Sequence, residues 1–287
     1  MARIRFGTCS WKYDSWQGLV YTKHAKNNYL SEYSQKYDTV EIDQWFWSLF
    51  GINKVSLPRA NVVAEYTNSV PDDFKFTIKI PNSITLTHFY KKQKTDPLED
   101  NPHFLSLDLF NTFLDSLKTM HSKIGLLMFQ FEYLNKQKMS SLDEFSDRFG
   151  RFIQHCDTRF NYAIEIRNPN YLRKTYFDFL QQNNLGHVFC QGYYMPDIAQ
   201  VYTNHWQQIT STTAIRLMGP DRSDIEEKSE GEWNQIYEAK DEEISRITKI
   251  IEELKQKNLD IYVNVNNHYE GSAPLTIEKI KNMMFPK

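Results

Sequence analysis

Charged side chains recur on one face of short segments in which apolar and polar residues alternate. Between Tyr162 and Arg167, apolar residues alternate with Ala163, Glu165 and Arg167. This period of two is expected of a strand with one apolar and one charged face. Pro169 ends the pattern. A glutamate and an arginine on one face, just before a break, indicate a site placed at the end of a strand.

Four further stretches show the same asymmetry. Their polar faces carry Glu41 and Asp43, Thr77 and Lys79, Arg216, and Asn264 and Asn266. Over the five stretches, three acidic side chains balance three basic ones. This balance matters because a buried charge is tolerated only when it is paired and hydrogen-bonded. A salt-bridge network that fills the interior would fit this set. We favour a polar pocket, because the charges fall in the last residues of the strands.

A histidine and two groups of aromatic or polar residues lie near the same strand ends. His268 has the parity of Asn266 if that strand continues, and a neutral imidazole acts as acid or base near pH 7. A structural, hydrogen-bonded histidine fits as well. Trp11 and Tyr13 follow the first strand, where they would either stack on a planar or sugar-like ligand or pack onto the fold. His88 is either a ligand contact or a loop residue.

A Gly-Pro segment gives a weaker indication of an anion site. Gly219, Pro220, Asp221 and Arg222 follow the stretch that carries Arg216. Two arginines there could bind an anion through their guanidinium forks. An ordinary Gly-Pro turn explains the segment equally well.

Eight strands must position these residues, with helices between them. The expected strands are residues 4–8, 39–43, 74–80, 124–131, 162–167, 186–190, 213–218 and 260–266. The expected helices are residues 28–36, a helix opened by Pro58, and residues 104–120, 142–153, 173–182, 195–206, 233–257 and 275–284. The helix at 142–153 begins with a capping box, Ser141 to Glu144. Residues 91–102 are expected to form an exposed loop.

Strands that alternate with helices require parallel pairing and right-handed crossovers. Eight such units in 287 residues predict an α/β fold, a TIM-like (β/α)8 barrel forming a single domain over residues 1–287. An open doubly wound sheet would need a Gly-rich turn after an early strand, and none is present. The outer face of a barrel packs on helices, so the charged faces should point into the lumen near its C-terminal mouth.

Composition excludes several classes of protein. The net charge of -2 argues against a strongly basic nucleic-acid surface, although a local basic patch is compatible with it. The three cysteines are far apart and include no Cys-x-x-Cys pair, so a cytoplasmic location fits best. We expect no signal peptide, and no segment approaches the apolar length of a membrane span.

The chain resembles the YecE-like family, domain of unknown function 72. The matching stretches are residues 7–16, 40–43, 76–79 with Thr87 and His88, Phe129 and Gln130, residues 163–167, and residues 266–268 followed by Ala273. The resemblance implies a TIM-like barrel and no established reaction. The family is likened to metal-dependent nuclease barrels by shape alone. This chain departs from the family pattern at Asp43, Trp47, Phe131-Glu132, Tyr171 and Met218, and the last two changes remove aromatic or titratable groups from the rim.

Our leading hypothesis is an enzyme, a hydrolase or lyase, that acts on an anionic substrate at the C-terminal mouth, with phosphate-containing compounds among the candidates. Glu41 or Glu165 would be the general base and His268 the acid. The expected contacts with a small or oligomeric anionic ligand are Trp11, Tyr13, Asp43, Lys79, His88, Gln130, Arg167, Arg216, Asn266 and Asn267.

Three alternatives stay open. A metal-dependent phosphoesterase could use Glu41, Asp43, Glu165 and His268 as ligands, but only His88, His187 and His268 lie near strand ends, so a divalent metal is not favoured. A glycosidase needs two carboxylates that flank a sugar. Barrel glycosidases commonly place theirs on the fourth and seventh strands, where this chain has Gln130 and Arg216. The third alternative is a binding protein without catalysis.

Overall fold

The structure of the protein is a computed structural model that describes residues 3–22, 28–91, 93, 95–220 and 222–286. Eight parallel strands form a nearly closed barrel in the order β1-β10-β9-β8-β7-β6-β5-β2. They are β1 (Ile4–Thr8), β2 (Thr39–Ile42), β5 (Lys75–Lys79), β6 (Ile124–Phe131), β7 (Tyr162–Ile166), β8 (Gly186–Gly192), β9 (Thr213–Gly219) and β10 (Ile261–Val265). This architecture confirms the predicted (β/α)8 barrel.

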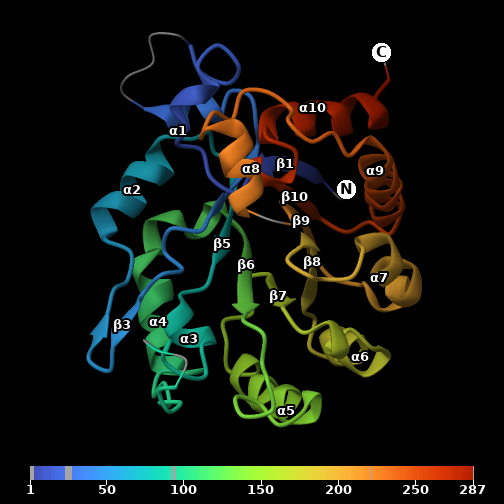
Figure 1. Ribbon diagram of the computed structural model, residues 1–287. Helices are drawn as coiled ribbons and strands as arrows, with labels where there is room; N and C mark the ends of the chain where they lie inside the picture. Colours follow the sequence, from blue (N-terminus) through green and yellow to red (C-terminus); the bar gives the residue numbers. More distant parts are fainter. Residues whose placement is uncertain (1–2, 23–27, 92, 94, 221, 287) are drawn as a thin grey trace.

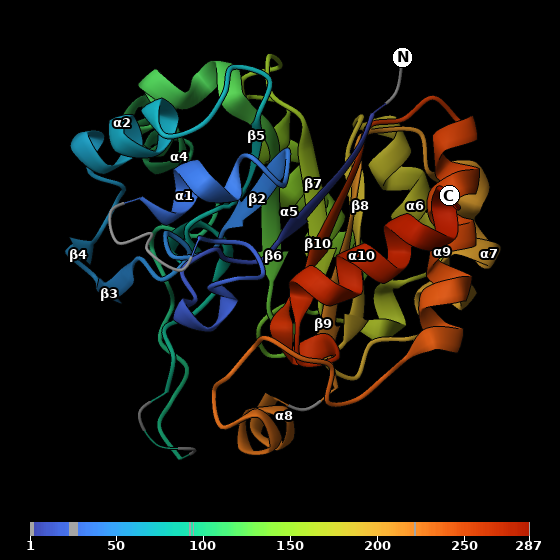
Figure 2. The ribbon, with the colours of Figure 1, turned by 90° about the horizontal axis from the view of Figure 1, so that it is seen from above.

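Helices alternate with these strands and lie outside them (Figure 1). They are α1 (Tyr29–Tyr33), α2 (Ala60–Asn68), α3 (Asn82–Thr85), α4 (Leu107–Ser116), α5 (Leu142–Ile153), α6 (Lys174–Gln182), α7 (Ile198–His205), α8 (Arg222–Ser229), α9 (Asp241–Gln256) and α10 (Ala273–Met284). Helix α8 differs from the others, because Figure 2 shows it beyond the end of the barrel opposite to the N-terminus. That end is the C-terminal mouth.

The start of α5 shows how the sequence sets these elements. The hydroxyl of Ser141 accepts a hydrogen bond from the backbone N–H of Glu144 at 3.1 Å, as the capping box predicts. The Glu144 carboxylate accepts from the backbone N–H of Ser140, one residue before the cap. The helix then buries Phe145, Phe149 and other apolar residues at helical spacing against the strands.

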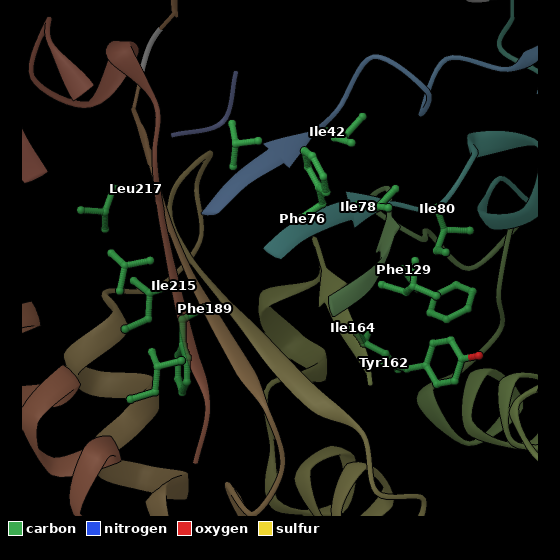
Figure 3. Packing of buried hydrophobic residues seen from close by; sticks show 14 of the residues in the cluster. Ile42, Phe76, Ile78, Ile80, Phe129, Tyr162, Ile164, Phe189, Ile215 and Leu217 are labelled. Atoms are coloured by element: carbon green, nitrogen blue, oxygen red, sulfur yellow. The ribbon is translucent and has the colours of Figure 1, made fainter. Parts of the chain in front are cut away.

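The alternation of each strand separates two layers of side chains. The outer layer is apolar and packs under the helices, and Figure 3 shows part of it on β2, β5, β6, β7, β8 and β9. A small apolar cluster fills the lower lumen with Leu126, Met128, Ala163, Val188, Ala214 and Tyr262. The Tyr262 ring lies against Gly125, where an added Cβ would meet the phenol oxygen at 2.2 Å. Above this cluster, towards the carboxyl ends of the strands, lie the polar residues Glu41, Glu165 and Arg216.

A tyrosine bridges the seam between β1 and β2, the two ends of the hydrogen-bonded sheet. The hydroxyl of Tyr33 accepts from the Thr8 N–H at 2.9 Å and donates to the Thr39 carbonyl at 3.0 Å. Gly7 lies at the same seam, where an added Cβ would meet the Thr39 carbonyl oxygen at 2.1 Å. The two strands approach so closely here that only glycine fits.

We expect Gly7→Ala to lower the free energy of unfolding by about 2–3 kcal/mol, because a backbone carbonyl must move to admit the methyl group. Urea unfolding of the purified variant measures this loss. Gly150→Ala in α5 is the control, since its Cβ would meet the Phe179 ring at an ordinary 3.4 Å. A helix interior gains about 0.5–1 kcal/mol from that change. Equal stability of the two variants would contradict the close seam.

Some expected boundaries were wrong. The helix expected at 233–257 begins only at Asp241, and Trp233 lies before it, buried. The helix expected at 104–120 ends at Ser116 and is followed by a 3₁₀ segment, Lys118–Lys123. The hairpin of β3 (Leu49–Gly51) and β4 (Lys54–Val55) and the short helices α3 and α8 were not predicted.

The segment expected to be an exposed loop extends from the barrel in the predicted place. Its described residues between 91 and 102 are mostly exposed, but Asn101 is buried. The Asn101 amide donates to the carbonyls of Ser83 and Leu86 at 2.8 and 2.6 Å, which anchors the loop to α3. In the described part of the chain, no helix is both long enough and apolar enough to cross a membrane.

Candidate functional site

A buried arginine organises the upper lumen. Nε and Nη2 of Arg216 donate to the two carboxylate oxygens of Glu41, each at 2.7 Å. Nη1 of Arg216 donates to Oε2 of Glu165 at 2.5 Å. All three side chains are at most 2% exposed. One guanidinium on β9 therefore holds carboxylates from β2 and β7, and such bidentate pairing fixes geometry as well as charge.

Asn264 and Arg167 complete the surroundings of these carboxylates. The Asn264 amide donates to Thr77 at 2.9 Å and to Glu41 at 3.4 Å. Arg167 pairs with the second oxygen of Glu165 and lies with its guanidinium 4.3 Å from the centre of the Tyr193 ring. Burial alone would raise the pKa of Glu165, but the charges of Arg167 and Arg216 outweigh it, and the pKa falls to about 2.

Because the pKa of Glu165 is lowered, the free energy of unfolding depends on pH in the acid range. Its stabilisation is complete above the unfolded value of 4.5 and is lost as the pH falls towards 2. We therefore expect Glu165→Gln to lose on the order of 3 kcal/mol at pH 7 and to change less than wild type between pH 4.5 and pH 2. Urea unfolding at several pH values measures how the free energy of unfolding of each protein changes with pH. Parallel curves for the two proteins would contradict the assignment.

Above this cluster lies a cavity of about 740 Å³ at the C-terminal mouth. Eight of the predicted site residues line it: Tyr13, Asp43, Lys79, Gln130, Arg167, Arg216, Asn266 and His268. They come from the ends of β2, β5, β6, β7, β9 and β10 and from the segment after β1. The structure thus brings together side chains that are far apart in the sequence, as the strand pattern predicted.

Asp43 and Lys79 differ from the other charged groups at this mouth. Among the described residues, neither forms an ion pair, and the Lys79 ammonium lies 4.2 Å from the centre of the Phe46 ring. Burial, followed by the charge of Glu41, raises the pKa of Asp43. Burial, followed by the charge of Arg216, lowers the pKa of Lys79. Both shifts move the groups towards neutral pH, where proton transfer is most effective.

His268 lies in the turn η5 (Asn267–Tyr269) that follows β10. Its Nε2 is 3.2 Å from Oε1 of Glu226 on α8, and the edge of the Trp233 ring packs against it at 5.1 Å between centroids. Burial, followed by the charge of Arg222, lowers the pKa of His268. The imidazole is therefore mostly neutral at pH 7, so only a small fraction of the molecules carries the proton that a general acid must give.

Aromatic residues that the sequence reading missed surround the mouth. Trp47, Tyr90, Tyr133 and Tyr194 line the cavity and are between 53% and 97% exposed. Tyr193 and Tyr194 both have positive φ, 53° and 62°, a conformation that is uncommon outside glycine. Strained residues of this kind cluster at functional sites. The segment 11–16 was the only aromatic group that the strand pattern had linked to the rim.

Five predicted site residues do not line the cavity. Glu41 and Glu165 lie beneath it, each paired with Arg216, so the structure places both glutamates outside the cavity lining. Trp11 is buried with its ring against Tyr66 at 5.0 Å.

His88 and Asn267 serve the backbone and nearby loops. His88 pairs with Asp100 at 3.0 Å and contacts the Thr87 hydroxyl. The Asn267 side chain accepts from the Ala273 N–H at 2.9 Å and so joins η5 to α10. The weaker anion segment is placed in part: Arg222 lines the cavity, whereas Asp221 lies outside the described residues.

Three of the four residues named for a metal site are engaged by other side chains, and Asp43 alone forms no ion pair among the described residues. Arg216 occupies Glu41 and Glu165, and Glu226 contacts His268. His187 is buried behind β8, beside the Tyr176 hydroxyl at 3.4 Å. Over the described ranges of the chain, no three His, Cys, Asp or Glu side chains are grouped so that they could hold a metal ion.

Comparisons with known proteins give the family and the fold. Over 172 residues, the chain is 24% identical to the UPF0759 protein YecE of Escherichia coli K12, a match that covers 60% of this chain and 51% of YecE. The chain thus spans about half the length of this curated relative. A DUF72 family protein of Enterococcus faecalis V583 superposes with a TM-score of 0.67 at 19% identity, over 99% of this chain and 96% of that one. A DUF72 family protein of Thermotoga maritima MSB8 gives 0.64 at 20% identity, over 98% of both chains. The model of the family described as protein of unknown function DUF72 matches residues 5–286, and the chain therefore belongs to that family.

Proposed function

We propose that this chain is an enzyme, a hydrolase or lyase, that acts on an organic anion bound at the mouth of the barrel. The observation that carries the proposal is that Asp43, Lys79 and Arg167 line the same cavity. Among the described residues, Asp43 and Lys79 form no ion pair. Arg167 pairs with Glu165 and also lines the cavity. Clefts that gather titratable groups with shifted pKa values are candidate active sites.

The vertical order of the charges favours an anionic ligand. Glu41 and Glu165 lie below the cavity and face Arg216. The cavity itself is lined by four cationic side chains, Lys79, Arg167, Arg216 and Arg222, and by two carboxylates, Asp43 and Glu132. A ligand that enters from the mouth therefore meets an excess of cationic groups. Guanidinium and ammonium groups are the usual partners of carboxylate and phosphate. We assign Arg167 and Lys79 as the anchors of the anion.

We assign Asp43 as the general base and Lys79 as the general acid. Burial raises the pKa of Asp43 and lowers that of Lys79, which strengthens each in its role at neutral pH. Asp43 would take a proton from water or from the substrate carbon, and Lys79 would give one to the leaving group. His268 suits the acid role less well than we expected from the sequence, because its pKa is lowered and Glu226 contacts it.

A binding protein without catalysis is the second candidate. The pairing of Glu41 and Glu165 with Arg216 favours it, since a saturated network provides a rigid base for a ligand and needs no chemistry. The two candidates share the anion site and differ only in turnover.

The test combines binding with turnover. Phosphate esters and carboxylates are screened for an increase in melting temperature, and each stabilising compound is then followed for product. Arg167→Leu should abolish the increase in melting temperature. Arg159→Leu is the control and should retain it, because Arg159 is exposed, pairs with Asp157 and precedes β7, whereas Arg167 follows that strand. Stabilisation without product would favour the binding protein. Equal stabilisation of Arg167→Leu and wild type would refute the anion site.

A further inference from the structure

A second cavity of about 530 Å³ adjoins the mouth of the barrel. It lies between the β3–β4 hairpin and two described stretches, residues 89–91 and residues 96, 97 and 99. Tyr90 lines both this cavity and the larger one. The two cavities are therefore adjacent, with Tyr90 at their border.

The second cavity is lined mainly by apolar side chains. Leu49, Phe50, Ile52, Phe89, Tyr90 and Pro97 contribute to it. Phe50 and Ile52 are 60% and 52% exposed, although the hairpin that carries them could have turned polar side chains to the solvent. Exposed apolar groups that gather around a hollow mark a binding surface.

Charge separates the two cavities. The larger one is lined by four basic side chains, Lys79, Arg167, Arg216 and Arg222, against two acidic ones, Asp43 and Glu132. The second one is lined by Asp96 and Glu99 against a single described lysine, Lys91. An anionic group is attracted to the first cavity and repelled by the second. A polyanion that followed both cavities would meet acidic groups along half of its path, which disfavours a nucleic-acid strand.

An aromatic pair lies where the two cavities adjoin. The rings of Trp47 and Tyr90 lie 6.2 Å apart at an angle of 44°, and both are more than half exposed. Their exposed faces offer stacking surfaces to an uncharged ring. The charged side chains of the second cavity, Lys91, Asp96 and Glu99, all follow Phe89, whereas the hairpin side is formed by Leu49, Phe50, Gly51 and Ile52 and offers an apolar group a surface to pack on.

We propose that the substrate is an elongated molecule with an anionic group at one end and an uncharged apolar group, such as an aromatic ring, at the other. The anion binds at Lys79 and Arg167, and the apolar end passes Trp47 and Tyr90 into the second cavity. This inference rests on the proposed function, because it takes the anion site as given.

Affinity for a series of phosphate esters tests it. Methyl phosphate probes the first cavity alone, 4-biphenylyl phosphate adds an apolar tail, and a disaccharide phosphate adds a polar tail of similar length. Binding is measured by calorimetry for wild type, Phe50→Ser and Ile52→Ser. Phe285→Ser is the matched control, since Phe285 is 54% exposed and lines a hollow at the N-terminal mouth. The three replaced side chains are all more than half exposed, so the fold should persist, and melting temperatures check this.

We expect the biphenylyl ester to bind about tenfold more tightly than methyl phosphate in wild type and in the control, from the burial of one or two rings. The gain should fall below about threefold in Phe50→Ser and Ile52→Ser, with unchanged affinity for methyl phosphate. Binding of methyl phosphate without any gain from the biphenylyl tail overturns the inference and leaves the proposed function intact. An equal gain from the disaccharide tail overturns the apolar assignment. Failure of every ester to bind overturns the anion site itself.

A second copy of the chain is the competing occupant of the apolar surface. Sedimentation of wild type and Phe50→Ser over a range of concentrations distinguishes the two. A monomer in both cases supports a ligand site. A wild-type dimer that Phe50→Ser dissociates overturns the inference.

Discussion

Replacing Arg216 with methionine is expected to lower the free energy of unfolding by about 3–5 kcal/mol, the usual consequence of removing one partner from a buried ion pair. The reason is that Glu41 and Glu165 keep their burial while they lose the guanidinium that both contact. Glu165 retains Arg167, but Glu41 retains only Asn264 among its described hydrogen-bond partners. Urea unfolding at pH 7 measures the loss.

Arg246→Met is the matched control for this change. Arg246 pairs with Asp197 at 3.2 Å, and its side chain is 49% exposed. Exposed pairs of this kind contribute at most about 1 kcal/mol. The account predicts a large difference between the two variants. An Arg216→Met protein as stable as Arg246→Met would show that the lumen cluster is hydrated or arranged differently.

Replacing Asp43 with asparagine is expected to reduce turnover by about 10²–10⁴-fold, the range associated with a positioned general base. Asparagine keeps the size and the polarity of the side chain but cannot take up a proton. Affinity for the substrate should change by less than about tenfold, since Arg167 and Lys79 hold the anion. Steady-state kinetics together with equilibrium binding of the same compound separates the two effects.

Asp38→Asn provides the comparison for Asp43→Asn. Asp38 also has a pKa raised by burial, and it accepts from the Phe6 N–H at 3.2 Å at the N-terminal end of β2. The two aspartates thus share a residue type and a strand but lie at opposite mouths of the barrel. Full turnover in Asp38→Asn with loss in Asp43→Asn supports the assignment. Wild-type turnover in Asp43→Asn would remove Asp43 from the chemistry.

The strand pattern was sufficient to predict the barrel and the convergence of its polar residues. A period of two leaves only one face for Lys79, Arg216 and Asn266 once the apolar face is packed under helices. Parallel strands place their carboxyl ends at one mouth. For this reason, side chains between positions 43 and 268 could be assigned to one cavity before any distance was known.

The division of roles among the carboxylates could not be predicted in the same way. Glu41 and Asp43 share a face, and parity does not tell which one Arg216 reaches across the lumen. Their depth offered a signal, because Asp43 lies two residues closer to the end of the strand and therefore nearer the mouth. Helix α8 could not be predicted from the local pattern either. Its eight residues include one aliphatic side chain, Ile225, and so lack an apolar stripe.

Aromatic residues at the rim were missed for a related reason. Tyr90, Tyr133 and Tyr194 lie in connections between strands and helices, where no periodicity places a side chain. In a chain with 17 tyrosines, residue type alone does not separate a wall of the cavity from the core. Only the path of each loop, which depends on contacts distant in sequence, decides it.

The central claim is that the strand ends form one cavity that binds an anion between Lys79 and Arg167. The most direct test is a crystal soaked in tungstate, whose anomalous scattering locates the anion without a model of the ligand. The account predicts a peak within hydrogen-bonding distance of the Lys79 ammonium and the Arg167 guanidinium, and its loss in Arg167→Leu. Tungstate bound only at other surfaces, with the mouth of the barrel empty at saturating concentration, would contradict it.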